Sequence, residues 1–243
     1  MIKSVLFDLD GTLLPLDQDA FFREYLKHMG RRAASIAEPK QFINQLLAST
    51  GTMINSKDKT KTNQQVFWED FLANVGIAED VLVPVMDNFY ETDFVLVKPT
   101  TRASKVARQA VMAVLELGLE VVVATNPIFP IHAVRQRIDW AGLGDINFKH
   151  VTSYEHCHFC KPNPDYYREI VDRIGRQPQE CLMVGNDVEE DLAAAKIGMK
   201  TYLVTDCLLN SKKLDFTTDY QGTLQELADS IAGIIKAENG GIS

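Results

Sequence analysis

The chain has 243 residues, of which 46% are hydrophobic and 24% are charged, as is usual for a globular protein with a substantial core. Its formal net charge is −8, and it has no run of basic residues, which argues against nucleic acid or an anionic membrane as a partner. We expect neither a signal peptide nor a membrane-spanning segment, so the four cysteines fit reduced thiols in a cytoplasmic protein.

The first predicted element is a buried strand that ends in two aspartates. The apolar residues 5–7 lead directly to Asp8, and Asp10 follows one residue later, before Gly11. Two carboxylates at the end of a buried strand repel each other and lose hydration, which is costly unless a cation or a reaction uses them. Ligands of open α/β sheets usually bind at this end of the strands. Asp8 and Asp10 are therefore the first candidate site residues.

The segment from Leu14 to about Val97 is predicted to be almost wholly helical. Apolar residues recur with helical spacing in four stretches, which cover residues 21–29, 42–47, 66–72 and 81–89. Four amphipathic helices of this length can form a small bundle. Apolar stripes with this spacing are typical of core packing rather than of a cofactor site.

From Lys98 onward, predicted helices alternate with short apolar strands. The predicted helices cover residues 103–116, 130–140 and 164–174, and the predicted strands cover 119–124, 181–184 and 201–204. This alternation predicts an α/β fold with a doubly wound, mostly parallel sheet. Because the Asp8 strand belongs to this sheet, the helical segment is an insertion. The predicted domains are an α/β core of residues 1–14 and 99–243 and an inserted helical domain of residues 15–98.

Two later segments add polar groups suited to an anion. Thr125 and Asn126 follow an apolar strand, where the hydroxyl and nearby backbone N–H groups could hold a phosphate oxygen, although a plain turn would explain them as well. Lys161 precedes a proline, which favours an extended backbone. A single lysine is usually a solvated surface residue. Near two carboxylates, however, its ammonium would lower their pKa and bind a transferred phosphoryl group.

A third segment is acidic and follows the strand that ends at Gly185. Acidic residues before an alanine-rich helix are explained by helix capping. Asp187 and Asp191 are four positions apart, however, so in a helical turn they would lie on one face, toward the edge of the sheet. Mg²⁺ prefers oxygen ligands, and a cluster of Asp8, Asp10 and Asp187 would suit it.

In order and spacing, these segments resemble the four motifs of the haloacid dehalogenase superfamily over essentially the whole chain. The matching residues are Asp8-Leu9-Asp10-Gly11-Thr12, Thr125, Lys161, and Gly185-Asn186-Asp187 with Asp191. The resemblance implies a Rossmann-like core with the strand order 5-4-1-2-3. It also implies that the inserted helices form a mobile cap over the site.

The resemblance places Asp10 in the phosphatase and phosphomutase branch, whose members carry a second aspartate two positions after the nucleophile. It therefore implies a Mg²⁺-dependent phosphatase that hydrolyses a small phosphorylated metabolite. A phosphate ester expels a poor leaving group that needs a proton from an acid, which dehalogenation does not. A phosphomutase of the β-phosphoglucomutase kind has the same motifs. A non-catalytic binding protein of this fold is a third hypothesis, but such a protein would be expected to lose one of the motif residues.

The resemblance also assigns a role to each residue of the site. Asp8 is the nucleophile that forms an aspartyl-phosphate, and Asp10 protonates the leaving oxygen and later deprotonates the attacking water. Mg²⁺ is held by the Asp8 carboxylate, the Asp10 backbone carbonyl and Asp187. The phosphoryl oxygens are oriented by Thr125, Lys161 and the backbone N–H of Asn126. Asp191 supports Lys161 or a metal-bound water.

A C-x-x-C pair, Cys157 and Cys160, directly precedes Lys161. Zinc needs four ligands and the chain has no second C-x-x-C, while thioredoxin-like pairs open a helix. We therefore expect a loop near the site whose thiols are sensitive to oxidation. The inserted helices carry no recognisable specificity signature, although Arg23 could reach a substrate anion.

Overall fold

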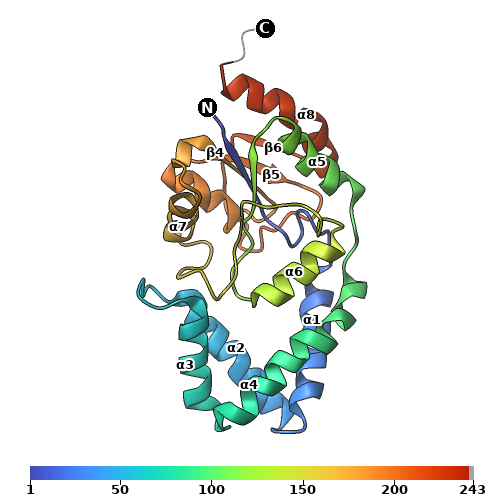
Figure 1. The fold of residues 1–243 in the computed structure, drawn as a ribbon, viewed down its shortest axis with the longest axis vertical. Helices are drawn as coiled ribbons and strands as arrows, with labels where there is room; N and C mark the ends of the chain where they lie inside the picture. Colours follow the sequence, from blue (N-terminus) through green and yellow to red (C-terminus); the bar gives the residue numbers. More distant parts are fainter. Residues whose placement is uncertain (241–243) are drawn as a thin grey trace.

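The computed structural model describes residues 1–240, which fold around one sheet of six parallel strands (Figure 1). The strands are β1 (Ser4–Phe7), β2 (Glu120–Val123), β3 (His150–Val151), β4 (Cys181–Gly185), β5 (Lys200–Val204) and β6 (Tyr220–Gly222). Their order is β3-β2-β1-β4-β5-β6. The expected order 5-4-1-2-3 is thereby confirmed for the first five strands. β6, which the sequence analysis did not predict, adds an edge strand beside β5.

The parallel register brings three strand ends to one place. β1 lies between β2 and β4, and Phe7 at its end pairs with Val123 on one side and Val184 on the other. Because parallel strands share one direction, the residues that follow these three positions leave the sheet at the same edge. These residues begin with Asp8 after β1 and Ala124 after β2.

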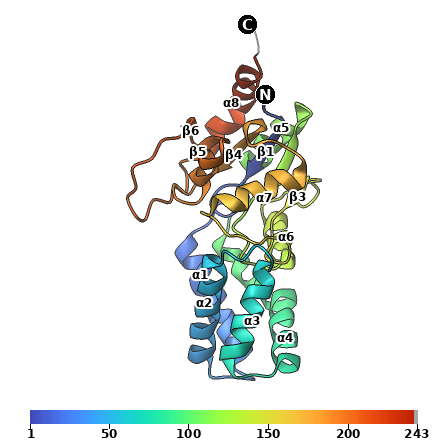
Figure 2. The same ribbon diagram turned by 90° about the vertical axis from the view of Figure 1, so that its left-hand side faces the viewer.

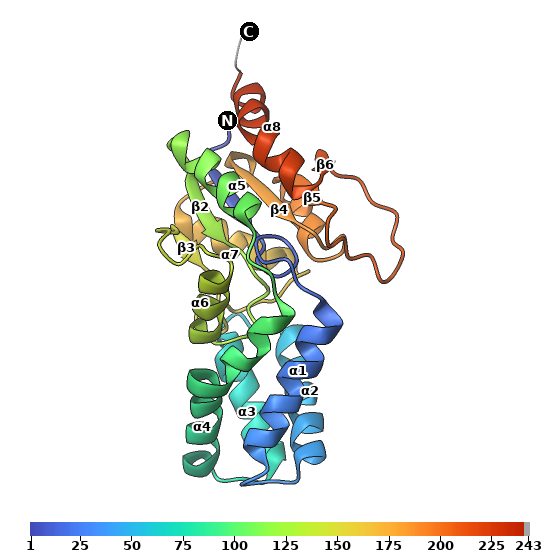
Figure 3. The same cartoon turned by 90° about the vertical axis from the view of Figure 1, so that its right-hand side faces the viewer.

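Helices cover both faces of the sheet, as expected of a doubly wound fold. On one face α5 (Lys105–Glu116) and α8 (Leu224–Glu238) pack together, and α7 (Pro164–Ile174) lies on the other (Figures 1 and 3). Successive residues of β1 supply both cores, since Val5 belongs to the first and Leu6 to the second.

The four helices expected between β1 and α5 are present. They are α1 (Gln18–Ala33), α2 (Pro39–Asn55), α3 (Asn63–Val75) and α4 (Glu79–Asn88), called here the inserted helices. They extend away from the sheet on the side opposite α8 and the N-terminus (Figures 2 and 3). The chain returns through a π-helical turn, η1 (Phe89–Asp93), and a 3₁₀ helix, η2 (Phe94–Thr100). The division into a core and a mobile cap stays a prediction.

Local sequence signals explain where the inserted helices begin and end. The Asp17 side chain accepts the N–H of Ala20 at the start of α1. Thr62 and Gln65 form a reciprocal capping box at the start of α3. Gly76 ends α3 in the left-handed conformation (φ 70°) that glycine adopts most readily.

Aromatic packing joins the inserted helices to α6 (Ile131–Trp140) and the loop before it. Tyr25 of α1 meets Phe129 edge-on with ring centroids 5.3 Å apart. Phe94 of η2 stacks on Trp140 at 5.2 Å. Such pairs contribute about 0.5–1.5 kcal/mol each beyond their area burial. The inserted helices and the sheet therefore share one continuous apolar cluster.

The α-helix expected in the alanine-rich segment after β4 is a wrong prediction. The segment forms a 3₁₀ helix, η4 (Asp191–Ile197), which ends at Gly198 with a φ of 92°. β5 begins at Lys200, so the connection between β4 and β5 is short, and a tight helix fits it. A second short 3₁₀ helix, η3 (Pro178–Glu180), leads into β4. Within residues 1–240, no helix has both the length and the apolar character needed to cross a membrane.

Candidate active site

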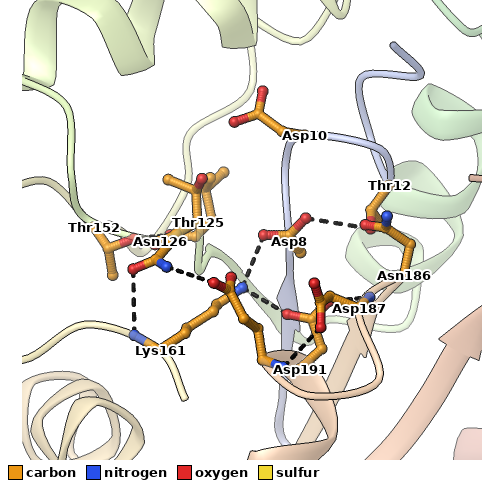
Figure 4. Close-up of polar contacts among 12 residues, drawn as sticks. Asp8, Asp10, Thr12, Thr125, Asn126, Thr152, Lys161, Asn186, Asp187 and Asp191 are labelled. Carbon is orange, nitrogen blue, oxygen red and sulfur yellow. Dashed lines mark hydrogen bonds and ion pairs between the residues drawn. The ribbon is translucent and has the colours of Figure 1, made fainter. Parts of the chain in front are cut away.

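A buried ion triad lies at the edge of the sheet where β1 and β4 end. The Lys161 ammonium donates to Asp8 Oδ1 at 2.8 Å and to Asp191 Oδ1 at 2.6 Å (Figure 4). Lys161 is only 1% exposed, so both ion pairs are shielded from water. The surface position that is usual for a lysine is thus excluded, and Lys161 meets the nucleophile candidate directly.

The loop before α7 is fixed by Asn126. The Asn126 side-chain carbonyl accepts the backbone N–H of Lys161 at 3.2 Å, while its amide donates to Glu190 Oε1 at 2.8 Å. The Asn163 side chain caps α7 by accepting the N–H of Asp165. The side chain of Asn126 therefore joins three segments, a role beyond the backbone N–H contact expected for it.

The turn after β4 places Asp187 and Asp191 beside each other. Asp191 Oδ2 accepts the Asp187 N–H at 2.9 Å, and Asp187 Oδ1 accepts the N–H groups of Glu189 and Glu190. A Cβ at Gly185 would lie 2.0 Å from Asp191 Oδ2, so only glycine fits at the strand end. The absence of a side chain at Gly185 lets the Asp191 carboxylate reach Lys161.

Thr125 lines the wall opposite this turn. Its carbonyl accepts hydrogen bonds from Thr152 Oγ1 at 2.7 Å and from the Tyr166 hydroxyl at 2.8 Å. On the other side of Asp8, Thr12 donates to Asn186 Oδ1 at 2.9 Å and lies 3.4 Å from Asp8 Oδ2. The Asp8 carboxylate is thus contacted by Thr12 at one oxygen and by Lys161 at the other.

Asp10 has a partner that the sequence analysis missed. Its Oδ2 forms an ion pair with Nη1 of Arg137, which is fully buried on α6, whereas its Oδ1 is buried without a partner within residues 1–240. The guanidinium carbon also lies 4.5 Å from the centre of the Phe129 ring. The sequence feature that could have revealed Arg137 is its position on the apolar face of a helix, beside Val134 and Ile138.

The pocket carries more negative than positive charge. Five carboxylates line it, those of Asp8, Asp10, Asp187, Glu190 and Asp191. Burial raises the pKa of Asp8 to about 7 despite Lys161, and burial raises the pKa of Glu190 to about 8. Burial also raises the pKa of Asp187 above its ordinary value. For Lys161, burial opposes the charge, but Asp191 and Asp8 hold its pKa well above the usual range.

One cavity of about 250 Å³ contains most of the predicted residues. Six of them line it: Asp8, Asp10, Thr125, Asn126, Asp187 and Asp191. The seventh, Lys161, lies beneath the pocket and contacts Asp8. α1 and α2 close the cavity with Phe22 and Ile54. The structure thus brings all seven together, while their catalytic roles stay predictions.

The donor groups fit a magnesium ion. Mg²⁺ is usually bound through one or two carboxylates, with waters and substrate phosphate supplying the other oxygens. Asp8 and Asp187 would provide the carboxylates and the backbone of Asp10 a carbonyl. Residues 1–240 hold no group of three His, Cys, Asp or Glu side chains placed around a metal. The uncompensated negative charge of the pocket favours a cation.

Two expectations are corrected by burial and position. Cys157 and Cys160 are free thiols, each 1% exposed. Burial raises the pKa of Cys157 to about 12 and that of Cys160 well above its ordinary value. Protonated, water-excluded thiols are unreactive, so the expected sensitivity to oxidation is not supported. Arg23 is exposed on α1 and does not line the cavity.

The sequence model of the family described as haloacid dehalogenase-like hydrolase matches residues 2–198. The chain belongs to this family. The matched range contains every residue of the site, from Asp8 to Asp191. The protein is therefore a hydrolase by family, with the α/β fold that its sheet displays.

Proteins with similar sequences are named as phosphatases. The glyceraldehyde 3-phosphate phosphatase of Methanocaldococcus jannaschii is 24% identical over 247 residues, covering 97% of this chain and 100% of its own length. The enzyme of the same name from Methanopyrus kandleri is 26% identical and covers 83% of both chains. The pyrophosphatase PpaX of Anoxybacillus flavithermus is 25% identical and covers 82% of both.

Solved structures confirm the haloacid dehalogenase-like fold. A phosphatase of this fold from Thermococcus onnurineus aligns with a TM-score of 0.59 and 19% identity, covering 96% of this chain and 99% of its own. L-2-haloacid dehalogenase from Xanthobacter autotrophicus aligns with a TM-score of 0.57 and 20% identity, covering 96% and 100%. A phosphatase and a dehalogenase match almost equally, so the fold alone does not select the reaction.

Proposed function

We propose that this protein is a phosphatase that hydrolyses a small phosphomonoester through an aspartyl-phosphate. The observation that carries the proposal is the position of Asp10, two residues after Asp8 and lining the same cavity. An ester needs an acid for its leaving oxygen, and we assign that role to Asp10. The phosphatase names of relatives that match most of the chain support the same reaction.

In the first step, an Asp8 carboxylate oxygen attacks phosphorus in line and the bond from phosphorus to the ester oxygen breaks. Asp10 gives its proton to the departing alkoxide, which leaves as an alcohol. Lys161 favours the ionised form of Asp8 and orients its carboxylate, because its ammonium is already 2.8 Å from Asp8 Oδ1. Thr125 and the Asn126 N–H would bind phosphoryl oxygens from the opposite wall.

In the second step, a water attacks the phosphorus of the aspartyl-phosphate. Asp10 takes the proton of that water, the bond from phosphorus to Asp8 breaks, and inorganic phosphate leaves. Asp8 is then regenerated as a carboxylate and Asp10 as an acid, so the cycle balances. When bound by Asp8, Asp187 and the Asp10 carbonyl, Mg²⁺ supplies charge neutralisation for the incoming phosphate. The inserted helices would exclude bulk water by closing over the pocket.

The test is phosphate release from phenyl phosphate and other monoesters, with and without Mg²⁺. We expect release that depends on Mg²⁺ and is absent from Asp8→Asn. Asp10→Asn should lose activity while keeping the charge pairing of Asp8. Release by Asp8→Asn at the wild-type rate would contradict the proposal. So would halide release from a 2-haloacid, or a stable aspartyl-phosphate passed only to a second sugar phosphate, as in a phosphomutase.

A further inference from the structure

Part of the cavity is lined by apolar side chains, called here the apolar wall. It is formed by Leu16, Phe22, Ile54, Ile128 and Phe129, which come from the inserted helices and two core loops. Building on the proposed function, we infer that the substrate is a phosphomonoester whose alcohol is neutral and largely apolar, such as a small aromatic or alkyl alcohol. This inference names the substrate class that the same pocket would select.

Charge supports the inference. No lysine, arginine or histidine is among the residues that line the cavity within residues 1–240. The two nearby cations, Lys161 and Arg137, are buried and already paired with Asp8 and Asp10. A carboxylate or second phosphate on the substrate would therefore lie in a pocket lined by five carboxylates, with no basic side chain left to pair with it. Desolvating an anion without such a partner is strongly unfavourable, so the pocket disfavours substrates that carry a second anionic group besides the phosphate to be hydrolysed.

The apolar wall would also favour binding of an apolar alcohol. Phe22 and Ile128 are only partly buried, so they still present apolar surface to the cavity. Covering that surface with an apolar alcohol gains about 25 cal/mol per Å². The neutral side chain of Gln18 also lines the cavity and is exposed, so it can accept or donate one hydrogen bond. With a cavity of about 250 Å³, the alcohol must be small.

The kinetic test compares small phosphate compounds that differ in the charge of the group attached to the phosphate. The wild-type protein with Mg²⁺ is assayed with phenyl phosphate, phosphoglycolate and pyrophosphate. We expect kcat/KM for phenyl phosphate to exceed both others by at least about tenfold. Equal or higher values for phosphoglycolate or pyrophosphate would overturn the inference while leaving the phosphatase proposal intact.

A substitution at the apolar wall makes the test sharper. Phe22→Arg adds a cation where the structure has none, so we expect it to raise kcat/KM for phosphoglycolate and lower that for phenyl phosphate, moving the ratio by at least about tenfold. Phe22→Leu is the matched control, and it should keep the wild-type order of preference. An unchanged ratio in Phe22→Arg would show that this wall does not contact the alcohol.

A binding measurement separates failure of the inference from failure of the proposed function. Phenylphosphonate and phosphonoacetate cannot be hydrolysed, and their binding to the wild-type protein with Mg²⁺ is measured by calorimetry. We expect tighter binding of phenylphosphonate by at least about tenfold. If no ester is hydrolysed, the phosphatase proposal fails, but this difference would still support the binding preference. Equal binding, stronger phosphonoacetate binding, or no binding of either compound would overturn it.

Discussion

Arg137 and Asp10 form an ion pair although they lie 127 positions apart in the chain. The arginine side chain is fully buried, whereas the Asp10 carboxylate is 28% exposed and faces the cavity. Figure 4 shows the Asp10 carboxylate directed away from Asp8. Arg137 is therefore a positioning residue that determines where the proposed acid rests, and Asp10 has to turn toward the substrate to act.

Replacing Arg137 with methionine should reduce catalysis more than binding. Asp10 would lose its fixed position, and a positioned acid or base contributes about 10²–10⁴-fold, so we expect kcat to fall by about 10–100-fold. KM should change by less than about threefold, because Arg137 does not line the cavity. Steady-state kinetics with a monoester gives both constants.

Arg137→Lys is the control for this substitution, because it keeps the charge but not the planar fork of donors. It should retain more activity than Arg137→Met. If Arg137 served only to fill the core, methionine would lower thermal stability without separating kcat from KM. That outcome would contradict a positioning role.

Removing the cation of the triad formed by Lys161, Asp8 and Asp191 should strongly destabilise the fold. Lys161→Met would leave Asp8 and Asp191 buried without their cation, and an uncompensated buried charge costs about 3–5 kcal/mol of unfolding free energy. Denaturant unfolding at neutral pH measures this loss. Adding Asp191→Asn to Lys161→Met should restore part of the stability, because one of the two stranded charges is removed. Additive effects of the two substitutions would contradict direct coupling in the triad.

The sequence sufficed to predict residues that lie at strand ends. Asp8, Thr125 and Asp187 follow apolar strands, and because parallel strands share one direction, such residues meet at one edge of the sheet. The inserted helices could be predicted because their apolar residues recur at helical spacing. In both cases a local pattern in the chain determines the structure.

Other features depend on contacts that no local pattern contains. The pairing of Arg137 with Asp10 joins distant segments, so the sequence showed only a misplaced charge on an apolar helix face. β3 and β6 have two and three residues, too few for a periodic signal. The C-x-x-C spacing says nothing of burial, which is what makes Cys157 and Cys160 unreactive.

Hydrogen bonds from Asn63 hold the start of α3 against the core. Its backbone N–H donates to the Cys157 carbonyl at 2.7 Å, and its side-chain amide contacts the Pro127 carbonyl at 3.2 Å and Cys160 Sγ at 3.3 Å. Asn63→Ala keeps the backbone bond and removes the others. We expect faster hydrogen exchange in the first turn of α3 and in the 154–160 loop, measured by mass spectrometry.

Asn63→Asp is the sharper companion variant. It has the same shape, but an ionised carboxylate cannot donate to a carbonyl, and keeping such a charge buried is unfavourable. Exchange at the contact should therefore increase further than in Asn63→Ala, while α8 on the far side of the sheet stays protected. Identical exchange in all three proteins would mean that these hydrogen bonds do not hold α3 in place.

We expect His150 to make the stability of the fold depend on pH. Burial, with Arg173 and His156 acting in the same direction, lowers the pKa of His150 to about 4. Its Nε2 is buried without a partner within residues 1–240, so the neutral ring is the form that the fold accommodates. In the unfolded chain the imidazole takes up a proton near its ordinary pKa of about 6.5.

The sign of the effect follows from proton linkage. Between about pH 6.5 and pH 4 the unfolded chain binds a proton at His150 that the folded chain does not, so this histidine makes the unfolding free energy decrease as the pH falls. His150→Val removes the titrating group and suits a strand. The two proteins are compared by denaturant unfolding first at about pH 7.5, where His150 is neutral in both states and any difference reports the substitution itself. Below about pH 6.5 the wild type should lose stability faster than the variant, and parallel curves down to about pH 4 would contradict the assignment.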